Sequence, residues 1–246
     1  MIDTITLDLW NTLISNTAED ARRFRRLRIQ GIIEAFLAEG INVEKEKVEK
    51  AHDITFKRCW DLWDKNLDCS SEEQIRILAD FLPDFGENPP ADLLKRLKKA
   101  YTESVLESPS ELVEGSSEIL KHLKNQKYKL GLICNTGRSP GKVLRKLMEH
   151  YQILDYFGAL SFSDELRIRK PDPEIFLYTL KNLKSIPSDS VHVGDELLTD
   201  VKGAKDAGMM AIHLSKTHST DQGIQPDYCI RKLKEIKEIA EELRGT

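Results

Sequence analysis

The second half of the chain alternates short apolar runs with amphipathic helical segments, and this alternation constrains the fold more than any other feature. Strands that alternate with helices imply a parallel sheet covered by helices on both faces. We therefore predict a doubly wound α/β domain here. The predicted strands are residues 129–135, 159–163, 190–193, 210–214 and 228–230, and the predicted helices are residues 116–126, 140–150, 173–183, 200–207 and 232–243.

A further buried strand is predicted at the N-terminus, where an apolar run from Ile2 to Leu9 carries Asp8 near its end. A carboxylate at that point lies at the carboxyl edge of a parallel sheet, which is where open α/β sheets bind ligands. Asp8 is thus a candidate for chemistry. It could equally serve only to cap the turn that follows the strand.

Residues 15–107 show helical patterns only, so they are predicted to form an all-helical insertion. The patterns begin near Thr17, and Ser71-Glu72-Glu73-Gln74 resembles a capping box. Ser108-Pro109-Ser110 is typical of a linker. The expected organisation is an α/β domain from residues 1–14 and 108–246, with residues 15–107 inserted. The helical patterns are residues 17–40, 44–66, 71–82 and 91–106.

The composition restricts the partners and the compartment. The 246 residues carry 37 Lys and Arg against 41 Asp and Glu, a net charge of −4, which predicts no general attraction to nucleic acid or anionic membrane. None of the four cysteines forms a CxxC pair, and no export signal or membrane span is apparent. We expect a cytoplasmic protein with free thiols. The oligomeric state cannot be inferred from these features.

Three further polar segments follow strands of the predicted sheet. They are Cys134-Asn135-Thr136-Gly137, the segment around Lys170, and the run from Gly194 through Asp195 to Asp200. In a parallel sheet all three would meet Asp8 at one edge. Each has a plainer interpretation, since Lys170 could be a surface lysine and Asp200 a helix cap. Because all of these segments occur together, the plainer interpretations are not expected to hold for all of them at once.

These segments carry a resemblance to the haloacid dehalogenase superfamily. Lys170-Pro171-Asp172-Pro173 followed by Gly194-Asp195-x-x-x-x-Asp200 is the strongest part of the match, and the four segments occur in the family's order. The resemblance covers the α/β part of the chain. It implies a Rossmann-like core, with residues 15–107 similar to the family's mobile helical cap.

The resemblance also implies roles for individual residues. Asp8 would be the nucleophile that forms a covalent aspartyl intermediate, and Lys170 would offset negative charge. Mg²⁺ would be the cofactor, since a hard cation suits oxygen ligands. The implied metal ligands are Asp8, Asp195, Asp200 and the backbone carbonyl of Trp10, and the implied donors to a phosphoryl group are Cys134, Asn135 and Thr136.

The sequence departs from the family pattern at Trp10 and Cys134. Phosphatases that this chain resembles have a second aspartate where Trp10 stands, and an indole has no usable proton-transfer chemistry. General acid–base catalysis contributes roughly 10²–10⁴ in rate, so monoester hydrolysis should be weakened. Candidate replacements in the insertion are Glu19, Asp20 and His52. Cys134 stands where Ser or Thr is usual, and Thr136 could take its place.

Three functions remain open at this stage. The leading hypothesis is a Mg²⁺-dependent phosphatase that acts on a small phosphorylated, anionic substrate. Trp10 also suits a metal-independent 2-haloacid dehalogenase, because a halide leaves without a proton; an arginine of the Arg22–Arg28 cluster would then bind the substrate carboxylate. The third is a phosphate- or metabolite-binding protein with little or no turnover. Most of that arginine cluster is expected to be a solvated helix flank.

Overall fold

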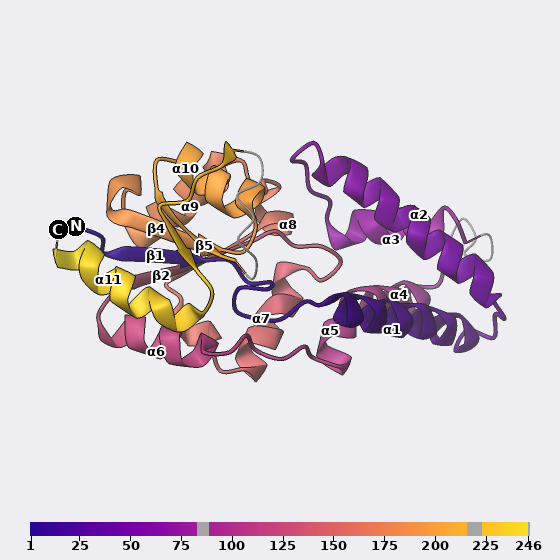
Figure 1. Ribbon diagram of the computed structural model, residues 1–246. Coiled ribbons are helices and arrows are strands. Elements are labelled where there is room, and N and C mark those ends of the chain that lie inside the picture. The colour runs from indigo at the N-terminus through magenta and orange to yellow at the C-terminus, as the bar shows by residue number, and fades with distance from the viewer. Residues whose placement is uncertain (83–88, 216–222, 246) are drawn as a thin grey trace.

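The computed structural model describes residues 1–82, 89–215 and 223–245, and its centre is a six-stranded parallel sheet (Figure 1). The strand order is β3-β2-β1-β4-β5-β6. From β1 in the middle, the chain first adds β2 and β3 on one side and then β4, β5 and β6 on the other. The predicted α/β class is confirmed. The strands are β1 (Thr4–Leu7), β2 (Lys129–Cys134), β3 (Ala159–Phe162), β4 (Ser190–Gly194), β5 (Met210–Leu214) and β6 (Tyr228–Ile230).

Helices cover both faces of this sheet, as the alternation of strands and helices predicts. Successive residues of β2 alternate between two cores: Leu132 belongs to the cluster shared with α6, α7 and α11, and Ile133 to the one shared with α9 and α10. Burial on both faces explains why the strands are continuously apolar. The helices are α6 (Ser116–Asn125), α7 (Gly141–His150), α8 (Ser163–Leu166), α9 (Pro173–Leu183), α10 (Gly203–Asp206) and α11 (Ile236–Gly245).

The described part of residues 15–107, between β1 and α6, forms a second, all-helical region, which we call the helical unit. It has its own apolar cluster, formed by residues such as Ile32, Phe36 and Leu97 and distinct from the two clusters of the sheet. Figure 1 shows it at one end of the molecule, beyond the strand ends. Its helices are α1 (Ala18–Leu37), α2 (Lys45–Trp63), α3 (Ser71–Ala79) and α4 (Ala91–Thr102), and α5 (Ser104–Glu107) follows them.

Capping boxes set the starts of α1 and α3, and the one at α3 differs from the prediction. Thr17 caps α1 together with Asp20, as the helix beginning near Thr17 requires. The box of α3 is formed by Ser70 and Glu73, so the predicted box at Ser71 was wrong by one residue. The side chain of Ser70 accepts from the backbone N–H of Glu73, whereas the same N–H is out of reach of a cap one residue later.

Three predicted helices are divided. The helix expected over residues 91–106 breaks at Glu103, which gives α4 and α5. The helix expected over 200–207 begins earlier, with a π-helical segment Leu197–Lys202 that continues into α10. The C-terminal helix begins with a 3₁₀ turn at Leu233.

The predicted break at Pro83 lies outside the described residues. No described helix is long and apolar enough to cross a bilayer.

Candidate active site

Asp8 lies just past the carboxyl end of the central strand β1. Its backbone N–H donates to the carbonyl of Val193 at 2.9 Å, so the sheet ladder fixes the residue where the strand ends. Its side chain is only 9% exposed and accepts a hydrogen bond from Lys170 Nζ at 2.6 Å. The carboxylate is therefore held at the sheet edge that the sequence predicted.

Lys170 is positioned by a reciprocal pair of backbone contacts. The side chain of Asn135, which follows β2, accepts from Lys170 N and donates to Lys170 O, each at 2.8 Å. Lys170 Nζ then lies between two carboxylates, 2.6 Å from Asp8 and 2.5 Å from Asp200. Burial alone would lower the pKa of Lys170, but Asp200 and Asp8 raise it above its ordinary value. Lys170 is thus charged at neutral pH.

Asp200 is fixed by groups on three sides. Besides Lys170, it contacts His192 Nε2 at 3.3 Å through Oδ1, and its Oδ2 accepts from the backbone N–H of Glu196 at 3.0 Å. Gly194 leaves the room for this arrangement: a Cβ there would be 2.2 Å from Asp200 Cγ. Burial would raise the pKa of Asp200, but the charge of Lys170 lowers it below its ordinary value.

Asp8, Asp195 and Asp200 form what we call the acidic cluster, with one carboxylate oxygen of each within 4.8 Å of the others. Three carboxylates face one lysine, so negative charge is in excess. Burial, and then the charge of Asp8, raises the pKa of Asp195 to about 8. Burial likewise raises the pKa of Asp8 to about 6, against the opposing effect of Lys170. Hard oxygen donors with surplus negative charge fit a divalent cation such as Mg²⁺.

The last residue of β2, Cys134, and the two residues after it are those predicted to contact a phosphoryl group. Cys134 is fully buried, and burial raises the pKa of its thiol well above the ordinary value. The side-chain amide of Asn135 is hydrogen-bonded to the backbone N–H and carbonyl of Lys170. The hydroxyl of Thr136 lies 3.1 Å from Ser163 Oγ and accepts from the backbone N–H of Asp164 at 3.1 Å. All three are at the same sheet edge as Asp8, and their contacts with a substrate stay predictions.

Trp10 lies two residues beyond Asp8, is partly buried, and packs against the main apolar cluster of the sheet. Its carbonyl as a metal ligand stays a prediction. Of the candidate replacements for the missing acid, Asp20 is occupied by the cap of α1 and by Arg23 at 2.6 Å. His52 is buried, and Glu19 is exposed.

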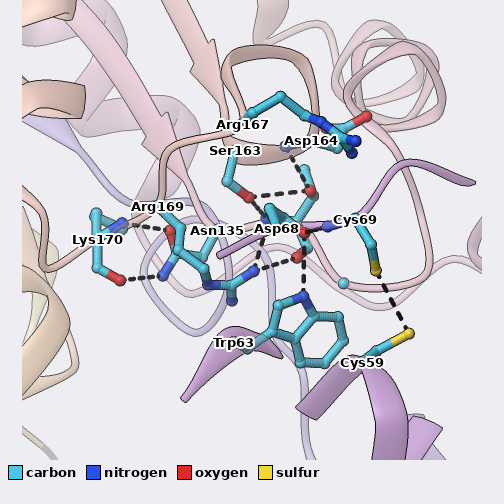
Figure 2. Close-up of polar contacts among 12 residues, drawn as sticks. Cys59, Trp63, Asp68, Cys69, Asn135, Ser163, Asp164, Arg167, Arg169 and Lys170 are labelled. Carbon is cyan, nitrogen blue, oxygen red and sulfur yellow. Dashed lines mark hydrogen bonds and ion pairs between the residues drawn. The ribbon is translucent and has the colours of Figure 1, made fainter. Parts of the chain in front are cut away.

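The helical unit meets the α/β domain through a buried ion pair that the sequence did not reveal (Figure 2). Asp68, in the loop between α2 and α3, accepts from Arg169 at 3.0 Å and from Trp63 Nε1 at 3.1 Å. Arg169 Cζ also lies 4.9 Å from the Trp63 ring. Because Arg169 directly precedes Lys170, this pair joins the helical unit to the loop that carries the site lysine.

Further contacts extend the same interface. Arg167 donates to both carboxylate oxygens of Glu73 at 2.6 and 2.7 Å, and Gln74 Nε2 donates to the carbonyl of Gly137 at 3.0 Å. The thiols of Cys59 and Cys69 are 3.5 Å apart beside Asp68 (Figure 2). No local pattern identifies the contacts of Arg169, Arg167 and Gln74 across the interface, because each joins segments that are distant in the chain.

Comparisons with known proteins identify the family of the chain. A sequence model of the family described as haloacid dehalogenase-like hydrolase matches residues 2–208. A glyceraldehyde 3-phosphate phosphatase of Methanopyrus kandleri is 26% identical over 197 residues, which are 72% of this chain and 82% of that protein. A phosphorylated carbohydrates phosphatase of Thermotoga maritima is 28% identical over 192 residues, 72% and 83% of the two chains.

The likeness extends to a solved structure. The crystal structure of a 2-haloacid dehalogenase from Pseudomonas syringae pv. Tomato DC3000 covers 98% of this chain with 99% of its own, at a TM-score of 0.72 and 23% identity. At that identity the likeness shows a shared fold. The family match spans both the site and the helical unit. The chain therefore belongs to the haloacid dehalogenase-like hydrolases.

Proposed function

We propose that the protein is a Mg²⁺-dependent phosphatase that acts on a small phosphorylated substrate. The observation that carries this proposal is the acidic cluster, in which Asp8 is paired with Lys170 while two further carboxylates lie beside it. A nucleophile needs only one carboxylate, so the additional pair is explained by a cation that binds with the phosphate. The phosphatases among the relatives support the same substrate class.

In this proposal Asp8 attacks the phosphorus atom. A bond forms between the carboxylate oxygen and phosphorus while the bond to the leaving oxygen breaks, and water then hydrolyses the aspartyl-phosphate to release inorganic phosphate. Lys170 orients Asp8 and offsets charge on the phosphoryl oxygens. Cys134, Asn135 and Thr136 line the phosphoryl end. The helical unit, residues 15–107, covers the site as a cap and excludes water.

The cation would be held by Asp8 and Asp195, with Asp200 and the Trp10 carbonyl close by. When bound, Mg²⁺ would neutralise the phosphoryl oxygens that surround the attacked phosphorus. Asp200 also holds Lys170 and the turn in place, through its contacts with Lys170 Nζ and the Glu196 N–H.

A first experiment measures hydrolysis of p-nitrophenyl phosphate and acetyl phosphate with Mg²⁺ and with EDTA. Turnover should require the cation, and Asp8→Asn should lower it by roughly 10⁴-fold or more. Acetyl phosphate and p-nitrophenyl phosphate should both react faster than an alkyl ester such as propyl phosphate, because acetate and p-nitrophenolate leave without taking up a proton. Turnover that Asp8→Asn leaves unchanged would exclude the proposed nucleophile.

Trp10 supplies a second experiment. If the missing acid limits the rate, Trp10→Asp should speed hydrolysis of the alkyl ester propyl phosphate by roughly 10²-fold, while acetyl phosphate hydrolysis changes little. The control is Trp60→Asp, at an exposed tryptophan of α2. A folded Trp10→Asp variant without such a gain contradicts this explanation.

Trp10 also favours a second candidate, 2-haloacid dehalogenation, in which Asp8 would attack carbon and displace a halide that needs no proton. Chloride release from 2-chloropropionate in the presence of EDTA is the decisive measurement. Release that depends on Asp8 but not on a cation would replace the phosphatase proposal. If neither reaction occurs while inorganic phosphate binds, the protein is a binding protein.

A further inference from the structure

Arg28 of the helical unit and Arg138 of the α/β domain have no acidic partner, and we call them the arginine pair. Arg28 comes from α1 and is 4% exposed, and Arg138 comes from the loop after β2 and is partly buried. Among the residues that the structure describes, neither guanidinium lies within 4.0 Å of a carboxylate. Buried charges without partners are costly, so such a pair calls for a specific explanation.

The contacts that hold the pair do not neutralise it. Arg28 Nε donates to the backbone carbonyl of Tyr101 at 2.9 Å. Arg138 Cζ lies 4.0 Å from the ring centroid of Phe56, a cation–π contact. These contacts fix the orientation of both side chains and leave both positive charges in place.

Donors beside the pair are left without acceptors. Arg138 Nε and the Tyr101 hydroxyl are buried and make no hydrogen bond of normal geometry, although the hydroxyl lies close to Arg138. Buried donors are nearly always satisfied in native proteins. An oxyanion is the group that accepts from a hydroxyl and a guanidinium at once.

Burial lowers the pKa of Arg138 and the negative charge of Asp53 opposes this effect, but Asp53 is already engaged. Asp53 of α2 is exposed and accepts two hydrogen bonds from Arg25, at 3.1 and 2.8 Å. Burial first, and the charge of Arg138 second, lower the pKa of Arg28 to about 9, so it is still charged at neutral pH. Arg28 and Arg138 are therefore both positively charged, and each is at least partly shielded from water.

The arginine pair is close to the candidate active site along the chain. Arg138 is three residues after Asn135, whose side chain binds the backbone of Lys170. The loop that holds Lys170 through Asn135 therefore also carries Arg138, so one short segment joins the arginine pair to the candidate active site.

We propose that Arg28 and Arg138 bind a second anionic group, on the end of the substrate that does not react. This inference rests on the proposed phosphatase function and narrows it to substrates with a phosphate at one end and a carboxylate or second phosphate at the other. Phosphate monoesters with an uncharged tail would lack this contact and would bind more weakly.

The first test measures binding by calorimetry, at constant ionic strength, with malonate and methylenediphosphonate as probes. Arg28→Met and Arg138→Met should each weaken the favoured probe by roughly 10- to 100-fold. The matched control is Arg26→Met, an exposed arginine on α1. The probe that depends on the pair identifies carboxylate or phosphate as its ligand, and no dependence for either probe overturns the proposal.

The second test compares kcat/KM for 2-phosphoglycolate, propane-1,3-diol bisphosphate and propyl phosphate. A charged tail should be preferred by roughly 10-fold or more, and Arg138→Met should remove the preference through KM. If all three esters react equally well, the anion site is refuted and the phosphatase function stands. If no ester reacts, the phosphatase function fails, and the calorimetry still decides whether the pair binds anions.

Folding of the variants is checked by circular dichroism. Arg28→Lys keeps the charge and should retain part of the binding, which a merely structural role would not predict. Arg138 lies in a loop and is partly exposed, so its variant carries the test if Arg28→Met does not fold.

Discussion

Arg169 and Arg138 lie at the same interface, both against aromatic rings of α2, but only one has an acidic partner. Arg169 donates to Asp68 at 3.0 Å and lies over Trp63, whereas Arg138 lies over Phe56 with no carboxylate within 4.0 Å among the described residues. A paired buried charge holds two parts of a protein together. An unpaired buried charge lowers the stability of the folded state, so its presence indicates a ligand-binding role.

The same contrast separates the two charged centres of the molecule. The acidic cluster has an excess of negative charge around Lys170, and the arginine pair has positive charge alone. One suits a cation together with a phosphate, the other an anion. Each of the following predictions tests which charges serve architecture and which serve binding.

The largest effect is expected from Lys170→Met. It would leave Asp8 and Asp200 buried without their cation, which should cost about 3–5 kcal/mol in the free energy of unfolding and abolish turnover. Urea unfolding measures the first effect and phosphatase assay the second. Lys202→Met, at an exposed lysine, is the control. Unchanged stability would mean that the cluster does not depend on Lys170.

The next prediction compares the two interface arginines directly. Arg169→Met should destabilise by about 3 kcal/mol, because it leaves Asp68 buried and unpaired, while Arg138→Met should be neutral or slightly stabilising. Thermal or urea unfolding without ligand gives both values. Equal losses in the two variants would refute the distinction between a structural and a ligand-binding arginine.

Gly194→Ala tests how closely the acidic cluster is built around the backbone. The added Cβ would be 2.2 Å from Asp200 Cγ, so Asp200 must move and its contacts with Lys170 and Glu196 must loosen. Overpacking of this kind costs about 1–3 kcal/mol. Urea unfolding and Mg²⁺-dependent turnover should both fall, and a variant with normal values would show that Asp200 can be displaced freely.

The smallest effect concerns His52, beside the arginine pair. Burial first, and Arg138 second, lower its pKa to about 4. The unfolded chain then binds a proton that the folded chain does not, so stability falls as the pH drops below about 6.5. Between pH 7.5 and 5.5 the loss should be about 1 kcal/mol. His52→Gln should remove this part of the pH dependence, and His150→Gln, at an exposed histidine, should not.

Much of the fold follows from local patterns. The strand positions, the helical character of the described part of residues 15–107 and the place of Asp8 at a strand end are all confirmed, because side-chain periodicity and caps act within a few residues. Helix divisions at Glu103 and Leu197 were missed, because they depend on side-chain and backbone contacts that periodicity does not report. The roles of the site residues remain predictions until they are measured.

The sequence by itself determined which chemical groups this protein owns and that four of its segments reach one edge of a parallel sheet. Only the tertiary structure decided which charges are paired. Lys170 meets an aspartate 162 positions away, Arg169 meets one 101 positions away, and Arg138 meets none within the described residues. Charge pairing depends on distances of a few ångströms between remote segments, and no local pattern encodes such distances.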